Sequence, residues 1–131
     1  MRLISAAILF LFIISAPVMA EDEGDSPQTI SYYEVKPSLV ANLASGGKYI
    51  RTDIQLMTKD DSLKEELDLH GPAIRHTLLL LLSQQDGKTI KTAAGKEALR
   101  KEALAAVNSL MKDLSGKENL AALFFTTFFV Q

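Results

Sequence analysis

Residues 121–131 read AALFFTTFFVQ, and this stretch decides the fold. It is rich in aromatic and β-branched residues and carries no charge, a combination that favours a strand. Alternation of side chains between strand faces places Phe124, Thr126, Phe128 and Val130 on one face and Leu123, Phe125, Thr127 and Phe129 on the other. Because both faces are apolar, the pattern predicts an inner strand, paired at its sides and covered on both faces by helices or another subunit.

A second strand is predicted at residues 48–58 (KYIRTDIQLMT), where apolar and polar residues alternate. The side chains expected to point toward the core are Ile50, Thr52, Ile54 and Leu56. Those expected to point toward solvent are Arg51, Asp53 and Gln55. Residues 30–43 are also β-prone, although Pro37 interrupts them, and residues 44–47 (ASGG) form a turn. The two segments are therefore predicted to pair as a hairpin.

Three helical segments are expected between this hairpin and the closing strand. Ser62 and Glu65 have the spacing of a capping box at the start of the first helix, which should end at Gly71. The second helix, residues 73–85, contains five consecutive leucines, and the third, residues 93–114, begins after a Thr92 cap and stops at residues 115–116. A short β bridge is expected at residues 89–90. The order β-β-α-α-β predicts a small α/β (α+β) domain with two main helices packed on the sheet.

The N-terminus has the features of a targeting segment. Arg2 precedes a mostly apolar run, Pro17 follows, and small residues lead to Ala20 before an acidic stretch. This pattern predicts a signal peptide over residues 1–20, and a short uncleaved membrane anchor is the alternative. Residues 21–29 are then a flexible acidic leader, and residues 30–131 form the folded domain.

Composition excludes several classes of function. The 131 residues suffice for one domain, and 47% are hydrophobic. A net charge of −2 gives no reason to expect nucleic-acid binding. The chain has no cysteine, which rules out disulfides, thiolate metal sites and a cysteine nucleophile.

No residue pattern predicts catalysis, cofactor binding or metal binding. His70 and His76 are six positions apart, without the i, i+4 spacing of a zinc helix, and are expected at the surface or at a helix end. Residues 92–97 (TAAGKE) resemble a phosphate loop only in their Gly-Lys pair and are interpreted as a helix start. The chain is therefore predicted not to be an enzyme. Its leucine and phenylalanine runs are either core or a surface shared with other copies.

With these segments placed, the chain resembles the flagellar basal-body-associated FliL family over about residues 33–131. The first matching segments are residues 36–43 (KPSLVANL), residues 49–51 (YIR) and residues 72–83, which run from Pro72 into the leucines. The later ones are Thr92, residues 95–99 (GKEAL), Glu102, Asn108 and residues 124–131 (FFTTFFVQ), which are similar to the closing Phe-Thr-x-Phe-Val-x-Gln of the family.

The resemblance implies a periplasmic domain with a stomatin-like (SPFH-type) fold. It implies a non-enzymatic motor accessory that forms ring-like homo-oligomers around flagellar stator units and supports torque under load, with the stator subunit of MotB type as partner. It implies no catalytic, cofactor-binding or metal-binding residue. Family members usually carry a cytoplasmic tip, a membrane helix and a longer linker, and this chain departs from that pattern. The alternative is a soluble periplasmic adaptor of the same fold that acts away from the flagellum; anchoring at the inner membrane applies if residues 1–20 are retained.

Overall fold

A computed structural model of the chain describes residues 29–131. The predicted signal peptide or anchor and nearly all of the predicted leader fall on residues 1–28, which lie outside the described part. The elements in chain order are β1 (Ser31–Asn42), β2 (Tyr49–Thr58), α1 (Leu63–Leu69), α2 (Gly71–Ser83), α3 (Gly87–Ile90), α4 (Ala93–Ser115) and β3 (Leu120–Val130).

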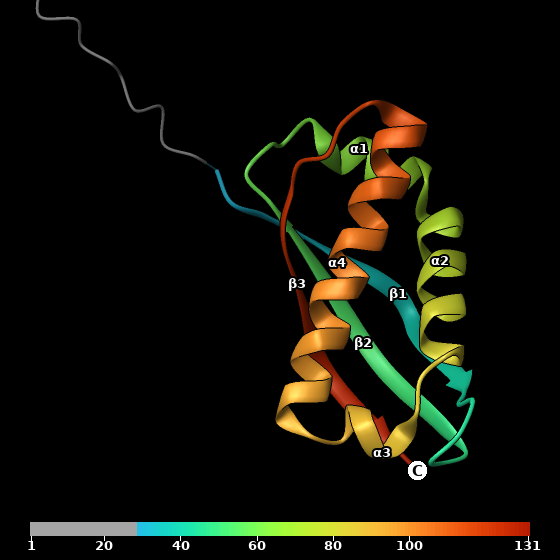
Figure 1. Cartoon of the computed structure of the whole chain (residues 1–131). Helices are drawn as coiled ribbons and strands as arrows, with labels where there is room; N and C mark the ends of the chain where they lie inside the picture. The colour runs from blue at the N-terminus through green and yellow to red at the C-terminus, as the bar shows by residue number, and fades with distance from the viewer. Residues whose placement is uncertain (1–28) are drawn as a thin grey trace, which may run out of the picture.

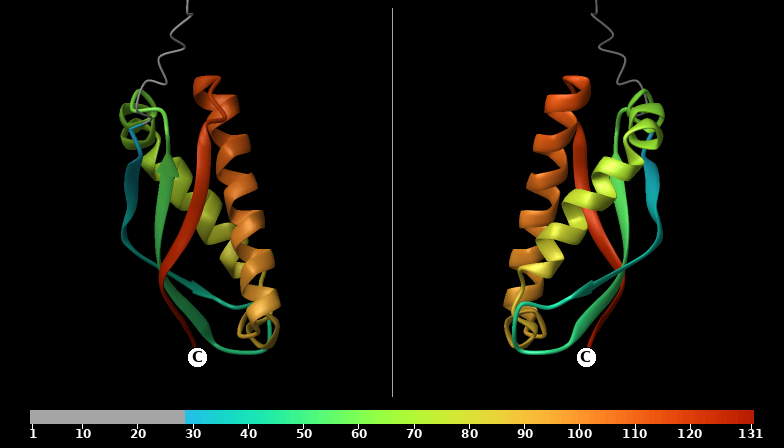
Figure 2. Two further views of the ribbon diagram at one scale, coloured as in Figure 1. Left: turned by 90° about the vertical axis from the view of Figure 1, so that its left-hand side faces the viewer. Right: turned by 90° about the vertical axis from the view of Figure 1, so that its right-hand side faces the viewer.

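The described elements form two layers (Figures 1 and 2). The sheet has the order β1-β2-β3 with antiparallel neighbours, and α2 and α4 lie together on one of its faces. The β1–β2 hairpin predicted from the sequence is confirmed, as is the small α/β architecture with two main helices on the sheet. The layer of helices covers only one side, so the opposite face of the sheet carries no element of the described chain.

The alternation predicted for β2 is confirmed. Its inward residues are buried at 0% exposure, and they face a core built from both main helices and β3. Burying each such aliphatic side chain contributes about 1.5–3 kcal/mol. The core residues with no exposed surface are Leu39, Ile50, Ile54, Leu56, Leu63, Leu67, Ile74, Leu78, Val107, Met111 and Leu123.

The prediction that the Phe-rich strand lies inside the sheet is wrong. β2 occupies the centre, and β3 is an edge strand that pairs only with β2 among the described strands. Phe124 and Phe129 are 41% and 53% exposed, so one face of β3 is not covered. The reason is that β1 and β2 pair directly with each other, so β3 can join the sheet only on the free side of the hairpin, where it has a single strand neighbour.

The faces predicted for β3 are also wrong beyond its midpoint, because a β-bulge interrupts the alternation. Asp53 of β2 pairs with Thr127, whereas the next residue, Ile54, pairs with Phe125, so Thr126 is an extra residue. A bulge of this kind shifts which residues face which side. The inward residues of β3 are therefore Leu123, Phe125, Phe128 and Val130.

The helix ends follow the sequence signals with two exceptions. The Thr92 hydroxyl accepts a hydrogen bond from the amide of Gly95 at 3.0 Å, and Gly116 ends α4 at φ 74°, as predicted. The prediction of a capping box at Ser62 is wrong. The Ser62 amide and hydroxyl both donate hydrogen bonds to the Asp60 carboxylate instead, at 3.0 and 2.6 Å.

The β bridge expected at residues 89–90 is the second exception. These residues belong to the short helix α3, which begins where the Asp86 side chain accepts a hydrogen bond from the amide of Lys88. The isolated bridge in this region pairs Ser45 with Asp86 instead.

Candidate interaction surface

The two histidines and their surroundings show no metal-binding geometry. His70 lies at the junction of α1 and α2, with Nε2 3.5 Å from the Glu66 carboxylate, and His76 is exposed on α2. No group of three or more His, Cys, Asp or Glu side chains within residues 29–131 could hold a metal ion.

Residues 92–97, which resemble a phosphate loop only in their Gly-Lys pair, form the first turn of α4, as predicted. Gly95 is required there for packing: a Cβ at this position would lie 1.9 Å from the carbonyl oxygen of Thr89. The glycine thus permits α4 to lie against the end of α3, and its amide already serves the Thr92 cap.

The uncovered face of the sheet, here called the open face, is the surface most suited to binding another protein. It is organised in rows across the three strands, set by the pairing register. From the β1 N-terminus onward, these rows are Tyr32–Met57–Ala122, Glu34–Gln55–Phe124, Ser38–Asp53–Thr127, Val40–Arg51–Phe129 and Asn42–Tyr49–Gln131.

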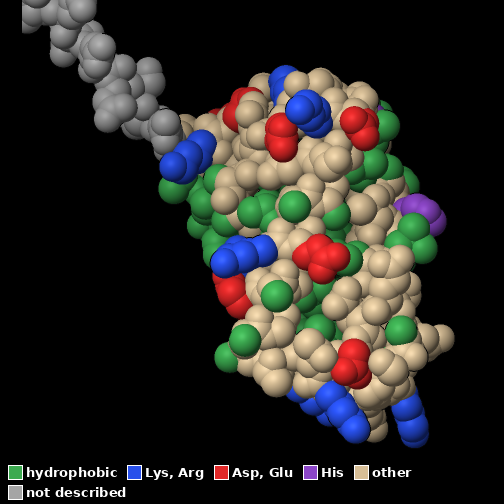
Figure 3. Space-filling model, viewed as in Figure 1, with side chains coloured by type: hydrophobic (Ala, Val, Ile, Leu, Met, Phe, Trp, Pro, Cys, Tyr) green, Lys and Arg blue, Asp and Glu red, His purple; other side chains and the backbone are tan. Residues whose placement is uncertain are grey.

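Aromatic side chains lie at both ends of the open face. The rings of Tyr32 and Phe124 are 6.5 Å apart between centroids, and those of Tyr49 and Phe129 are 6.2 Å apart. Tyr32 is 54% exposed. Exposed aromatic groups of this density are typical of protein interfaces rather than of bare surface. In contrast, hydrophobic and charged side chains are interspersed on the side that carries the helices (Figure 3).

Asp53 joins all three strands at the centre of the open face. Its carboxylate accepts hydrogen bonds from the hydroxyl of Ser38 on β1 and, at 2.7 Å, from the hydroxyl of Thr127 on β3. Both neighbouring strands depart from regular pairing opposite this residue. The Thr127 hydroxyl also accepts from the Asp53 amide at 3.1 Å. The carboxylate therefore fixes the bulge and the register together.

These hydrogen bonds, from Ser38 first and then Thr127, lower the pKa of Asp53, with a smaller contribution from the charge of Arg51. A depressed folded-state pKa adds stability above the ordinary pKa of about 3.9, and this stability is lost as the pH falls through the lower folded value. We expect Asp53→Asn to unfold at a lower urea concentration than the native chain at pH 7, and the gap to shrink as the pH falls below the ordinary carboxyl pKa of about 3.9. Urea midpoints measured at pH 7 and along an acid series check this.

The matched control removes a donor instead of the charge. Ser38→Ala should make the urea midpoint of unfolding less dependent on pH in acid, as Asp53→Asn does. The reason is that the variant lacks the hydroxyl that is the main cause of the pKa shift of Asp53. An unchanged pH dependence in both variants would contradict the role given to this carboxylate.

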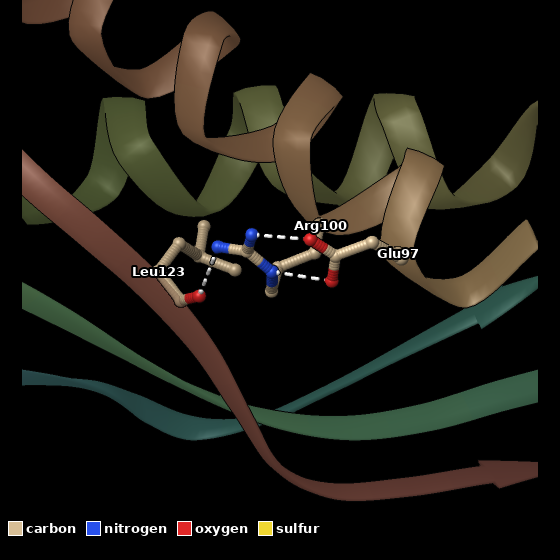
Figure 4. Close-up of polar contacts among 3 residues, drawn as sticks. All are labelled: Glu97, Arg100 and Leu123. Atoms are coloured by element: carbon tan, nitrogen blue, oxygen red, sulfur yellow. Dashed lines mark hydrogen bonds and ion pairs between the residues drawn. The ribbon is translucent and has the colours of Figure 1, made fainter. Parts of the chain in front are cut away.

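The outer edge of β3 is partly protected by side chains of α4. The Asn108 side chain accepts a hydrogen bond from the Leu120 amide at 3.0 Å and donates one to the Leu120 carbonyl at 3.1 Å. These are the hydrogen bonds that a neighbouring strand would otherwise make with this edge. Arg100 donates to the Leu123 carbonyl at 3.3 Å and is held by two hydrogen bonds to Glu97, of 2.8 and 2.5 Å (Figure 4). The hydrogen bond and charge of Arg100 lower the pKa of Glu97, and Glu97 raises that of Arg100.

A groove of about 550 Å³ lies between β1 and α2. Its walls include Tyr33, Asp68 and Arg75, and the Arg75 guanidinium donates to the Pro37 carbonyl of β1. Burial first, and the charge of Asp68 second, raise the pKa of Tyr33. Arg75 thus protects the β1 edge of the sheet, as Arg100 protects the β3 edge. The residues that line the groove include no nucleophile placed beside a general base.

The family model described as "Flagellar basal body-associated protein FliL" matches residues 32–131. The chain belongs to the FliL family. The match covers nearly all of the described FliL domain, from the start of β1 to Gln131.

Curated FliL proteins are similar over the same region. The chain is 27% identical over 107 residues to "Flagellar protein FliL" of Aquifex aeolicus, covering 80% of this chain and 64% of that protein. It is 25% identical over 120 residues to "Flagellar protein FliL" of Escherichia coli K12, covering 89% of this chain and 77% of that protein. The match therefore spans less than two thirds of the Aquifex relative.

No helix within residues 29–131 has the length and apolar character needed to cross a membrane.

The residues that carry the FliL resemblance mostly hold the fold together. Ser38 binds Asp53, and the Tyr49 hydroxyl donates to the Gln131 side chain at 2.8 Å. The structural roles of Asp53 and Arg100 are not predicted from the sequence. For Asp53, an available signal was its position on the polar face of an alternating strand, opposite a pair of threonines in the closing strand.

Proposed function

We propose that this FliL-family protein is a non-enzymatic accessory of the flagellar motor. The observation that carries the proposal is the family match over residues 32–131, with relatives that are themselves flagellar proteins. The protein would associate with the basal body and support motility or torque under load. Its chemistry would be binding alone, in keeping with the aromatic open face and the solvated carboxylates.

The proposed location is the periplasm, at the flagellar basal body, with an inner-membrane attachment if residues 1–20 are retained. The proposed partners are other copies of the chain, in a ring-like homo-oligomer, and the stator subunit of MotB type. Exposed aromatic residues that gather on one face of the sheet support a role in a protein assembly.

Deletion of the gene tests the proposal. We expect reduced swimming or swarming, most marked in viscous medium where load on the motor is high, and restoration by the native chain. Affinity capture of the full chain from membranes should recover stator or basal-body proteins. Normal motility in liquid and viscous medium, together with capture of an unrelated envelope assembly, would instead identify a periplasmic adaptor acting away from the flagellum.

A further inference from the structure

β1 is an edge strand that pairs only with β2 among the described strands, and α2 lies beside it (Figure 1). The direction of its main-chain groups follows from the register. Tyr49 of β2 exchanges hydrogen bonds with Gln131, so the N–H and C=O of Tyr49 face away from β1. Because the main-chain groups of successive residues in an antiparallel strand point to alternate sides, every second residue of β2 from Ile50 onward faces β1 instead.

The same alternation leaves part of β1 with unused hydrogen-bonding groups. Tyr33 and Val35 pair with the residues of β2 that face β1. The intervening residues, Tyr32 and Glu34, therefore direct their N–H and C=O groups to the outer edge of the sheet. An extended chain laid along this edge can make four main-chain hydrogen bonds, two with each of these residues.

The groove of about 550 Å³ between β1 and α2 runs along this edge. Its α2 wall extends over two helical turns, from Pro72 to Leu79, which is about 10 Å. An extended chain covers that length with about three residues. Val35 and Leu79 supply apolar contacts, and the volume lies within the range of about 300–1,000 Å³ that is typical of ligand sites. The groove therefore has the size and the lining to hold a short segment of strand.

The two ends of the groove differ in charge. At one end Asp68 lies near the Tyr33 hydroxyl, whose pKa is raised by burial and then by this negative charge. At the other end the Arg75 guanidinium donates to the β1 main chain, and His76 follows it on α2. Within residues 29–131 neither Arg75 nor His76 forms an ion pair, whereas Lys36 is already held by a β1 carboxylate at 3.1 Å. A carboxylate on a ligand would thus be attracted to the Arg75 end and repelled from the Asp68 end.

We propose that the groove binds an extended peptide segment of another protein, added antiparallel to β1, with a carboxylate side chain at Arg75 and His76. Antiparallel pairing is the commoner arrangement, and it fixes the order of the side chains. The acidic residue lies opposite Val35, and an apolar residue two positions later lies opposite Tyr33, both directed toward α2. The residue between them exchanges two hydrogen bonds with Glu34. The segment therefore has the pattern acidic-x-apolar.

This groove is separate from the open face, and the proposal does not depend on the flagellar role. A synthetic peptide, fluorescein-Gly-Ser-Thr-Glu-Thr-Ile-Thr-Ser-amide, tests it by fluorescence anisotropy with the full chain. N-methylation of the threonine between glutamate and isoleucine removes the N–H that bonds to Glu34, so binding should weaken about tenfold. N-methylation of the glutamate is the matched control, because its N–H points away from β1, and this peptide should bind as the parent peptide does.

A protein variant tests the charged end of the groove. Arg75→Gln should weaken binding of the parent peptide about tenfold, because a charge-assisted hydrogen bond is lost. Lys101→Gln, on the exposed surface of α4, should leave binding unchanged. A peptide with glutamine in place of glutamate should bind the native chain more weakly, and the same replacement should matter less for Arg75→Gln, because the two changes remove one interaction.

Equal binding of the two N-methylated peptides overturns the proposal, as does the absence of binding by the parent peptide at millimolar concentration. The N-methylated pair uses the native chain, so this result stands even if Arg75→Gln fails to fold. An affinity that falls as the protein concentration rises would mean that a second copy occupies the groove, and it also contradicts the proposal. Equal competition by an unlabelled peptide of residues 21–28 (EDEGDSPQ) would assign the groove to the chain's own acidic leader instead.

Discussion

Gly95→Ala is expected to lower the free energy of unfolding by more than about 3 kcal/mol, at the upper end of the cost of overpacking. The new Cβ would lie 1.9 Å from the carbonyl oxygen and 2.7 Å from the carbonyl carbon of Thr89. Both are main-chain atoms, so a side-chain rotation cannot relieve the clash. Either α3 or the first turn of α4 must move, and the Thr92 cap, which uses the Gly95 amide, moves with it.

Urea denaturation followed by circular dichroism measures the loss. The matched control is Ala94→Gly, one residue earlier in the same exposed turn, which should cost about 1 kcal/mol through chain entropy alone. If Gly95→Ala unfolds at the same urea concentration as the native chain, the close approach of α3 to α4 is not present in solution.

Leu123→Ala is expected to cost about 2–5 kcal/mol, because a fully buried leucine loses its packing and leaves a cavity. Phe124→Ala, at the adjacent position on the open face, should cost much less. The comparison is made at low protein concentration, so that any self-association through the open face does not contribute.

The corresponding comparison beyond the bulge tests the register. Phe128 is partly buried against the core, and Phe129 is 53% exposed, so Phe128→Ala should be the more destabilising of the two. Uninterrupted alternation from Leu123 would place Phe129 inward instead. A larger loss for Phe129→Ala would therefore show that the strand lacks the bulge at Thr126.

The sequence predicts those parts of the fold in which local pattern and burial agree. β2 has mostly aliphatic residues on one face and Arg51, Asp53 and Gln55 on the other, so only one face of it could be buried. The long helix has an unambiguous cap and stop, at Thr92 and Gly116. The hairpin follows from the two glycines between its strands.

The closing strand could not be predicted to the same extent, and its composition explains why. The run Phe-Phe-Thr-Thr-Phe-Phe presents equally apolar faces in either phase, so hydrophobic pattern cannot determine which side faces the core. The phase is set by partners distant in sequence, chiefly the hydrogen bonds of Asp53 with Thr127. Its edge position follows from the direct pairing of β1 with β2, which leaves only one side of the hairpin for β3.

The candidate surface was only partly accessible to sequence analysis for a related reason. A shared apolar surface was expected from the leucine and phenylalanine content. Its location on the face opposite the helices requires knowledge of which side α2 and α4 occupy. The roles of Arg75 and Arg100 at the two sheet edges depend on tertiary contacts with carbonyl groups of β1 and β3.

The strand order has a consequence for how the chain acquires its structure. The β1–β2 hairpin can form from neighbouring residues, but β3 joins β2 only after residues 59–119 have been made. Contacts over such a separation form late, because closing a long loop is entropically costly. A nascent chain that has not yet presented β3 lacks a third of its sheet, so it should remain open and sensitive to proteases until synthesis reaches the phenylalanines.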